Sequence, residues 1–276
     1  MNTTLPAPTV DIDSAYRISE AQIAQFNRDG FIKLKDVFTK DQLEAYRGEI
    51  TRKVKEMNAN GTPLEKRSTY GKAFLQIMNL WRHSELVKEF VFGKRVARIA
   101  TELMGTKGVR VYHDQALYKE AGGGYTPWHV DQFYWPLETE KTVTAWIPLH
   151  PVPIENGPLS FAVGSQRIKF GRDLEISDES EKAIDQHLKL SDFPVQESAY
   201  DLGEVSFHMG FNFHRAGPNT LDYPREVMTI IFMDSEMRLA KPRNKSQEND
   251  WKNWCPGAEI GEIIASPLNP LIYERE

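Results

Sequence analysis

The sequence predicts a β-sandwich or barrel with helices packed on one side of it. From Val109 onward, short runs rich in β-branched and aromatic residues alternate with turn signals, a pattern typical of all-β cores. Helical periodicity comes before that point, so helices should pack against the β core. No linker divides the chain. We therefore predict one domain over residues 1–276, with a loose leader at 1–16, helical support at 17–108, a β core at 109–235 and a C-terminal extension at 236–276.

Composition limits the function classes that remain. The chain has 276 residues, 40% hydrophobic and 26% charged, which is enough for a sizeable core. A net charge of −5 without a long basic run argues against a nucleic-acid partner. The N-terminus lacks the features of a signal peptide, and no stretch approaches the roughly 18 apolar residues of a membrane span. We expect a cytoplasmic protein with no membrane insertion. With a single cysteine, a metal site would use histidine and carboxylate ligands.

The helical support begins with two capping boxes, Ser19 with Gln22 and Thr39 with Gln42. Gly30 ends the first predicted helix, and residues 31–34 follow as a short strand. The second predicted helix carries an apolar stripe at Leu43, Tyr46, Ile50, Val54 and Met57. Core packing explains this stripe without any functional role. Residues 84–104 predict a further helical region, interrupted near Gly93.

The predicted strands of the β core are short. They cover residues 109–119, 142–149, 159–163, 201–208 and 226–233. Residues 168–194 are charged and partly helical, and we expect them to form an excursion over the core. The C-terminal extension contains tryptophans and prolines and is expected to cover the core or a partner.

A candidate metal site lies in the β core. His129 and Asp131 are two positions apart, and residues two apart in a strand point to the same face, so both can bind one ion. His214, just before the turn at residues 217–219, is the best third ligand, and His208 is its only plausible rival. Two histidines and one carboxylate that leave other positions open are typical of non-heme Fe(II) oxygenases, which use O2. A lone His-x-Asp is common by chance, so the surrounding β-rich context and the downstream residues carry the prediction.

Arg225 adds a second feature at the start of the strand 226–233. A guanidinium that is buried in a barrel needs an anionic partner. A dicarboxylate co-substrate could supply one through bidentate pairing. The alternative is a surface ion pair at a strand end. A zinc hydrolase would use similar metal ligands but has no need for Arg225.

Substrate-facing residues are predicted from strand alternation and aromatic clustering. One face of the strand 109–119 carries Val109, Val111, His113, Gln115, Leu117 and Lys119. Polar His113 and Gln115 on this face either line a cavity or make surface hydrogen bonds. An aromatic run follows the metal pair, Phe133, Tyr134 and Trp135, and forms a substrate wall or core packing. Gln76, Asn79 and Arg82 from the helical part are candidates to close the pocket.

The motifs together resemble the phytanoyl-CoA dioxygenase family of Fe(II)/2-oxoglutarate-dependent oxygenases. The resemblance covers about residues 22 to 235. It is carried by Phe26 with Asp29-Gly30-Phe31-Ile32, by Trp128-His129-Val130-Asp131-Gln132, by Asn156-Gly157-Pro158-Leu159 with Gly164-Ser165-Gln166, and by His214-Arg215-Ala216-Gly217-Pro218-Asn219 with Arg225. The metal pair and the spacing from His214 to Arg225 are its most specific parts.

The resemblance implies a double-stranded β-helix, a jelly-roll barrel with the metal at one mouth. It makes His129, Asp131 and His214 the Fe(II) ligands and Arg225 the partner of the distal carboxylate of 2-oxoglutarate. Trp146 matches an aromatic position near the co-substrate, although it could equally be a core residue. The implied requirements are Fe(II), 2-oxoglutarate and O2, with ascorbate as the reductant in vitro.

The implied reaction is oxidation, most simply hydroxylation, of an unactivated C–H bond in a small apolar or ring-containing substrate, with release of succinate and CO2. Desaturation, epoxidation and cyclisation remain open as outcomes. The presence of Asp131 disfavours halogenation, because halogenating relatives replace this carboxylate with a small residue. The alternatives are a phosphonate or amino-acid hydroxylase and a non-catalytic metal-binding jelly-roll protein. A homo-oligomer is left open.

Overall fold

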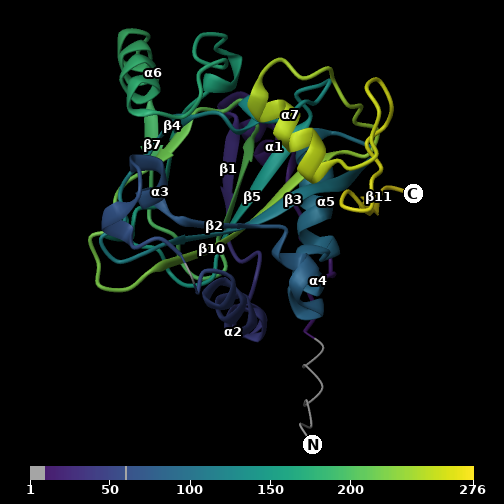
Figure 1. The fold of residues 1–276 in the computed structure, drawn as a ribbon. Coiled ribbons are helices and arrows are strands. Elements are labelled where there is room, and N and C mark those ends of the chain that lie inside the picture. Colours follow the sequence, from purple (N-terminus) through teal and green to yellow (C-terminus); the bar gives the residue numbers. More distant parts are fainter. Residues whose placement is uncertain (1–9, 60) are drawn as a thin grey trace, which may run out of the picture.

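Two antiparallel sheets face each other, and most of the helices lie outside the larger one (Figure 1). The computed structural model describes residues 10–59 and 61–276, so residues 1–9 of the expected leader lie outside it. Within this described part, the major sheet has seven strands in the order β1-β8-β5-β10-β3-β11, with β2 also paired to β3. The minor sheet has the order β4-β9-β6-β7.

Strands β1, β3, β5, β6, β8 and β10 overlap the predicted β runs, whereas β2, β7, β9 and β11 lie outside them. The major sheet contains β1 (Phe31–Leu34), β2 (Leu75–Met78), β3 (Gly108–Lys119), β5 (Thr142–Pro148), β8 (Val205–Met209), β10 (Arg225–Asp234) and β11 (Leu271–Glu274). The minor sheet contains β4 (Thr126–His129), β6 (Leu159–Ala162), β7 (Val195–Glu197) and β9 (His214–Ala216). The sheets do not close into a barrel, and the fold is of the jelly-roll type with two facing sheets.

The first two helices begin where the two capping boxes predict. The helices are α1 (Glu20–Asp29), α2 (Lys40–Met57), α3 (Thr69–Ala73), α4 (Glu85–Val91), α5 (Lys94–Met104), α6 (Asp178–Leu190) and α7 (Lys245–Trp254). Both capping boxes are present, and Gly30 ends α1 with a φ of 84°. Gly93 separates α4 from α5, as the predicted interruption near it indicates. Short 3-10 turns lie at Leu64–Lys66, Leu80–His83, Asp131–Phe133, Ile154–Asn156 and Ser165–Arg167.

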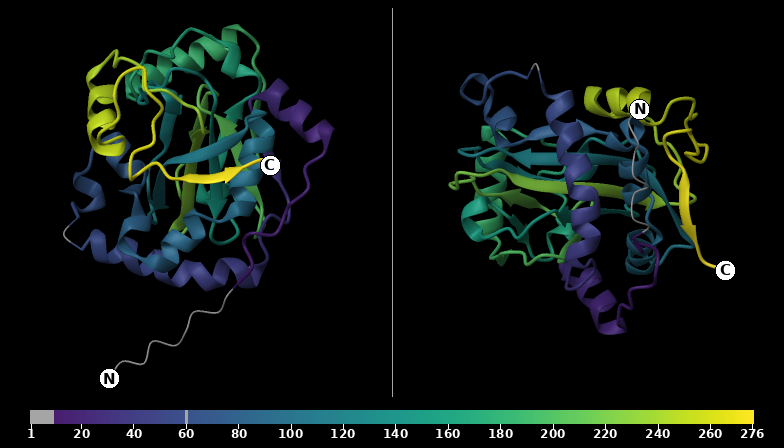
Figure 2. Two further views of the ribbon diagram at one scale, coloured as in Figure 1. Left: turned by 90° about the vertical axis from the view of Figure 1, so that its right-hand side faces the viewer. Right: turned by 90° about the horizontal axis from the view of Figure 1, so that it is seen from below.

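The main core lies between the major sheet and helices α1, α2, α4 and α5. The long helix α2 crosses the strands of this sheet (Figure 2). Its stripe is buried as predicted, with Leu43 and Ile50 fully inaccessible, except that Met57 is 41% exposed. Burying one such aliphatic side chain stabilises the fold by about 1.5–3 kcal/mol. The described part of the leader is also packed, because Ile12 is buried and the Arg95 side chain donates to Asp11 and Ser14.

A β-bulge in β3 changes which residues face the cavity. In the pairing with β10, Ile231 lies opposite His113 and Phe232 lies opposite Val111, so Tyr112 is the extra residue. Val109 and Val111 therefore face the helical core, whereas His113 lines the cavity between the sheets. The prediction of a single face running through the whole strand was wrong, because one inserted residue shifts the alternation by one position.

Candidate metal centre

His129 and His214 are cross-strand neighbours in the minor sheet. His129 is the last residue of β4, His214 is the first residue of β9, and the two are direct partners in the antiparallel register. Their ring centroids are 4.2 Å apart. Residues that lie directly opposite each other in an antiparallel pair bring their side chains to one place, so the strand pairing itself assembles these two imidazoles.

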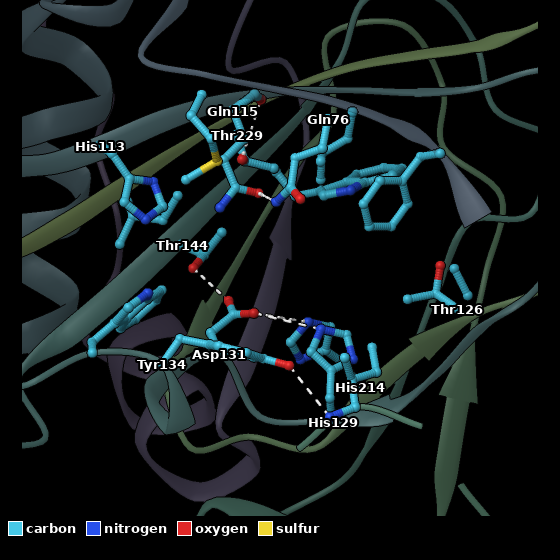
Figure 3. A pocket seen from close by; sticks show the side chains of 18 of the residues that line it. Gln76, His113, Gln115, Thr126, His129, Asp131, Tyr134, Thr144, His214 and Thr229 are labelled. Carbon is cyan, nitrogen blue, oxygen red and sulfur yellow. Dashed lines mark hydrogen bonds and ion pairs between the residues drawn. The ribbon is translucent and has the colours of Figure 1, made fainter. Parts of the chain in front are cut away.

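Asp131 reaches the same place from a turn. It begins the 3-10 turn Asp131–Phe133 that follows β4, rather than continuing the strand as predicted. Its Oδ1 lies 3.6 Å from His129 Nε2 and 3.5 Å from His214 Nε2 (Figure 3). The three donor atoms lie within 4.8 Å of one another. This is a separation that a single ion can bridge.

The histidine tautomers suit metal binding. The carbonyl of Pro127 lies 2.8 Å from His129 Nδ1, and that of Asn212 lies 3.0 Å from His214 Nδ1. A carbonyl can only accept, so each Nδ1 carries the proton and each Nε2 offers its lone pair toward Asp131. Burial and the neighbouring His129 lower the pKa of His214 well below its ordinary value, so its imidazole is neutral. The donor set therefore fits a first-row divalent metal such as Fe(II).

The second oxygen of Asp131 is fixed by the major sheet. Thr144 on β5 donates its hydroxyl to Oδ2 at 2.9 Å. His208 on β8 places Nε2 at 3.2 Å from the same oxygen. His208 therefore contacts the other carboxylate oxygen, and its ring lies 4.4 Å from the His214 ring, but it is not part of the three-residue donor cluster. Between the two histidines considered as third ligand, the geometry favours His214.

Arg225 is buried without a carboxylate partner. Its exposed fraction is 1%, its Nη1 donates to the carbonyl of Gly157, and its Nε has no hydrogen-bond partner in the described residues. The guanidinium carbon lies 5.3 Å from the ring centroid of Trp146. Burial lowers the pKa of Arg225 to about 9, although the nearby Tyr200 opposes this shift. Both Arg225 and Trp146 line the cavity that contains the three metal-binding candidates.

Lys119 is a second buried basic side chain near Arg225. The two residues are partners in the β3–β10 register, and Lys119 is fully inaccessible. Its Nζ donates to the carbonyl of Gly124. Burial and repulsion from Arg225 lower the pKa of Lys119 to about 6. Neither side chain has a carboxylate within salt-bridge distance among residues 10–59 and 61–276, so this corner of the molecule favours an anion from outside the chain.

The motif residues around Arg225 form a close backbone contact. Gly157 has a φ of 71°, and a Cβ added to it would lie 2.3 Å from the carbonyl oxygen of Gly217. Asn156 Nδ2 donates to Asn219 Oδ1 at 2.8 Å across the same contact. Only glycine fits here, because the two backbone segments lie so close together. This close contact places the Gly157 carbonyl where Arg225 can donate a hydrogen bond to it.

The cavity between the sheets has a volume of about 500 Å³. Most of the predicted substrate residues line it, namely Trp135 and the four that Figure 3 labels, His113, Gln115, Gln76 and Tyr134. Gln76 Nε2 donates to Gln115 Oε1 at 3.1 Å, so these two side chains satisfy each other. Asn79 does not line the cavity. It is buried with a φ of 47°, and its Oδ1 accepts a hydrogen bond from the Trp81 indole.

Sequence reasoning missed several residues around the site. Thr144 and Lys119 each occupy a strand position that alternates onto the cavity side, but an isolated threonine or lysine in a strand carries no functional signal. Asp250 and Trp254 on α7 also line the cavity. Their spacing of four along a helix was the available signal, but the polar sequence of α7 hides the helix from periodicity.

Comparison with known proteins identifies the class. The model of the family described as "Phytanoyl-CoA dioxygenase (PhyH)" matches residues 26–227. An ectoine dioxygenase from Sphingopyxis alaskensis is 24% identical over 257 residues, covering 85% of this chain and 82% of the relative. One from Streptomyces coelicolor is 21% identical over 249 residues, covering 83% of this chain and 82% of the relative.

Solved structures share the fold. The non-heme alpha ketoglutarate dependent carbocyclase SnoK from nogalamycin biosynthesis superposes with a TM-score of 0.75 at 22% identity, covering 93% of this chain and 97% of that one. EctD from S. alaskensis, solved with 2-oxoglutarate and 5-hydroxyectoine, gives a TM-score of 0.70 at 19% identity, covering 94% of this chain and 92% of that one. Because the family model matches most of its length, the chain belongs to the phytanoyl-CoA dioxygenase (PhyH) family of Fe(II)- and 2-oxoglutarate-dependent dioxygenases.

Proposed function

We propose that His129, Asp131 and His214 bind Fe(II), that Arg225 binds the distal carboxylate of 2-oxoglutarate, and that the enzyme hydroxylates a C–H bond of a small apolar or ring-containing molecule. O2 is the oxidant, and succinate and CO2 are the co-products. The observation that carries the proposal is the buried, unpartnered guanidinium of Arg225, which shares one cavity with the His-Asp-His cluster. A zinc hydrolase or a purely structural metal site would leave that charge without a function.

The side chains around the cavity have separate roles. When bound, the metal and co-substrate supply the oxidising chemistry. His129 and His214 present neutral Nε2 atoms, and Thr144 holds the Asp131 carboxylate in one orientation. Arg225 anchors an anionic group at the far end of the cavity and so fixes which part of the co-substrate faces the metal-binding residues. The Trp146 ring packs beside the guanidinium and shields it from water.

The test is binding of 2-oxoglutarate to the full chain loaded with Fe(II) under nitrogen, measured by isothermal titration calorimetry. The wild type should bind it, and Arg225→Gln should raise the Kd by about 100-fold, because a buried charge-assisted pair is lost. Arg17→Gln, which removes an exposed arginine, is the matched control and should leave the Kd unchanged. Equal affinity in wild type and Arg225→Gln would refute the assignment of Arg225.

Turnover separates an oxygenase from a non-catalytic binding protein. With Fe(II), ascorbate and O2 present, the wild type should convert 2-oxoglutarate to succinate, slowly without substrate and faster with it. Succinate is measured by mass spectrometry, and a screen of small molecules for stimulation identifies the substrate. If neither binding nor succinate formation occurs, the chain is a jelly-roll protein without this activity.

A further inference from the structure

We propose that the cavity carries a second recognition site, built by Asp250, Trp254 and His113, that binds the protonated amine of the substrate. Asp250 and Trp254 lie on the cavity-facing side of α7, and His113 lies on β3 opposite them. This inference deepens the proposed function, because it names a chemical class of substrate. It rests on the proposed function only in treating the bound amine as the molecule that is oxidised. Helix α7 begins after residue 227, where the match to the family model ends.

Asp250 is positioned by a neighbouring tyrosine. The Tyr112 hydroxyl donates to Asp250 Oδ2 at 3.1 Å. Tyr112 is the extra residue of the β3 bulge, so the bulge that turns His113 toward the cavity also supplies this hydrogen bond. Burial raises the pKa of Asp250 to about 7, which is the cost of a carboxylate without a counter-ion. A bound cation would remove that cost.

His113 gives an independent indication of a ligand. Its exposed fraction is 1%, it lines the same cavity, and its Nδ1 has no hydrogen-bond partner among the described residues. Burial lowers the pKa of His113 to about 3, so the ring is neutral and keeps one nitrogen as an acceptor. A buried ring nitrogen without a partner is costly, and a polar ligand group that reaches the His113 ring would lower that cost.

Aromatic rings complete the site. The Trp254 ring lies 5.9 Å and the Trp135 ring 6.1 Å from the His113 ring, centroid to centroid. Indole faces attract cations, and a carboxylate together with a neutral imidazole acceptor suits the several N–H donors of an ammonium group. The charges of the cavity agree with this. Beyond Asp131, its lining among the described residues contains two carboxylates, Asp250 and Glu175, and one cation, Arg225.

The arrangement selects against anionic groups at this end. Asp250 and the exposed Glu175 would repel a carboxylate or phosphate, whereas an amine gains an ion pair in a partly desolvated place. Arg225 is left for the co-substrate. The two ends of the cavity therefore have opposite preferences, for an anion at Arg225 and for a cation at Asp250.

The experiment compares three probes with one ring and different charges: cyclohexylmethylamine, cyclohexylmethanol and cyclohexanecarboxylate. Each is titrated calorimetrically into the full chain loaded with Fe(II) and 2-oxoglutarate under nitrogen. The amine should bind at least about tenfold more tightly than the alcohol, because hydrogen bonds to charged groups are worth more than neutral ones. The carboxylate should bind more weakly than either.

Two variants locate the effect. Asp250→Asn retains an acceptor for Tyr112 and should remove most of the preference for the amine over the alcohol. Glu248→Gln removes a charge from the exposed side of the same helix and should leave the preference intact. Equal binding of amine and alcohol, no binding of any probe, or an unchanged preference in Asp250→Asn would overturn the proposal.

The outcome for the amine site can be distinguished from the outcome for the proposed function. If 2-oxoglutarate binds and is converted to succinate but the amine shows no preference, the amine site is wrong and the oxygenase assignment stands. If the amine preference is present and depends on Asp250 but 2-oxoglutarate does not bind, the site stands and the proposed function fails.

Discussion

The two ends of the cavity are built in different ways. At the metal end, every side chain comes from a strand or the turn directly after one, and the backbone ladder of β4 and β9 sets the distance between the histidines. At the Asp250 end, Asp250 and Trp254 come from α7, which is attached mainly by side chains. Gln247 Nε2 donates to the Phe133 carbonyl at 2.9 Å, and Asp250 accepts from Tyr112.

This difference indicates how one fold can serve several reactions. A hydrogen-bonded ladder fixes positions to within a fraction of an ångström, which metal ligands need. A helix held by a few side-chain contacts can change its sequence without disturbing that ladder. The family match ends at residue 227, inside β10, and α7 lies beyond it. The comparison predicts large effects from changes at the metal end and smaller, graded effects from its supports.

The largest effect is expected from Asp131→Ala. Removing the carboxylate leaves two imidazoles facing an open position, so Fe(II) affinity should fall steeply and succinate formation should be abolished. Iron retained after anaerobic dialysis and succinate released are the two measurements. His129→Ala should give the same result. Full activity in either variant would refute the assignment of the metal ligands. The control is Asp173→Ala, which removes an exposed carboxylate away from the cluster.

The metal end was predictable because its signals are local. His129 and Asp131 are two positions apart in sequence, and the spacing from His214 to Arg225 follows from one turn and one strand. The same holds for α1 and α2, whose capping boxes predict where they begin. The predicted alternation of β3 is wrong beyond Tyr112, where the strand has a bulge. A bulge depends on the pairing with the neighbouring strand, and the periodicity of a single strand carries no information about that pairing.

The Asp250 end was not predictable for a different reason. Helix α7 has few apolar residues, so its cavity-facing side shows no stripe. Its contact with β3 joins Tyr112 to Asp250, which are 138 residues apart in the chain. Lys119 was visible as a strand residue, but its significance depends on Arg225 lying directly opposite it. The role of such a residue is visible only once the pairing between distant segments of the chain is known.

An intermediate effect is expected from Thr144→Val, which removes the hydroxyl that donates to Asp131 Oδ2. Partners that orient a metal ligand typically change metal affinity by about 10–100-fold. The Kd for Fe(II) should rise within that range, while the unfolding temperature changes little, because valine has the same shape. Thr144→Ser keeps the hydroxyl and should restore the affinity. A fall in stability with unchanged iron affinity would show that Thr144 only packs.

The smallest effect is expected from Glu181→Gln on α6. Glu181 accepts hydrogen bonds from the Trp128 backbone N–H and from Arg215 Nη1, the latter at 3.2 Å, so α6 is fastened to both strands that carry the histidines. Because the β4–β9 ladder already sets their distance, the Kd for Fe(II) should rise by only about threefold, within the range of a partly exposed ion pair. Glu179→Gln, on the exposed side of α6, should leave it unchanged. A loss as large as that of Thr144→Val would mean that the ladder alone does not position the ligands, and that α6 belongs to the metal end.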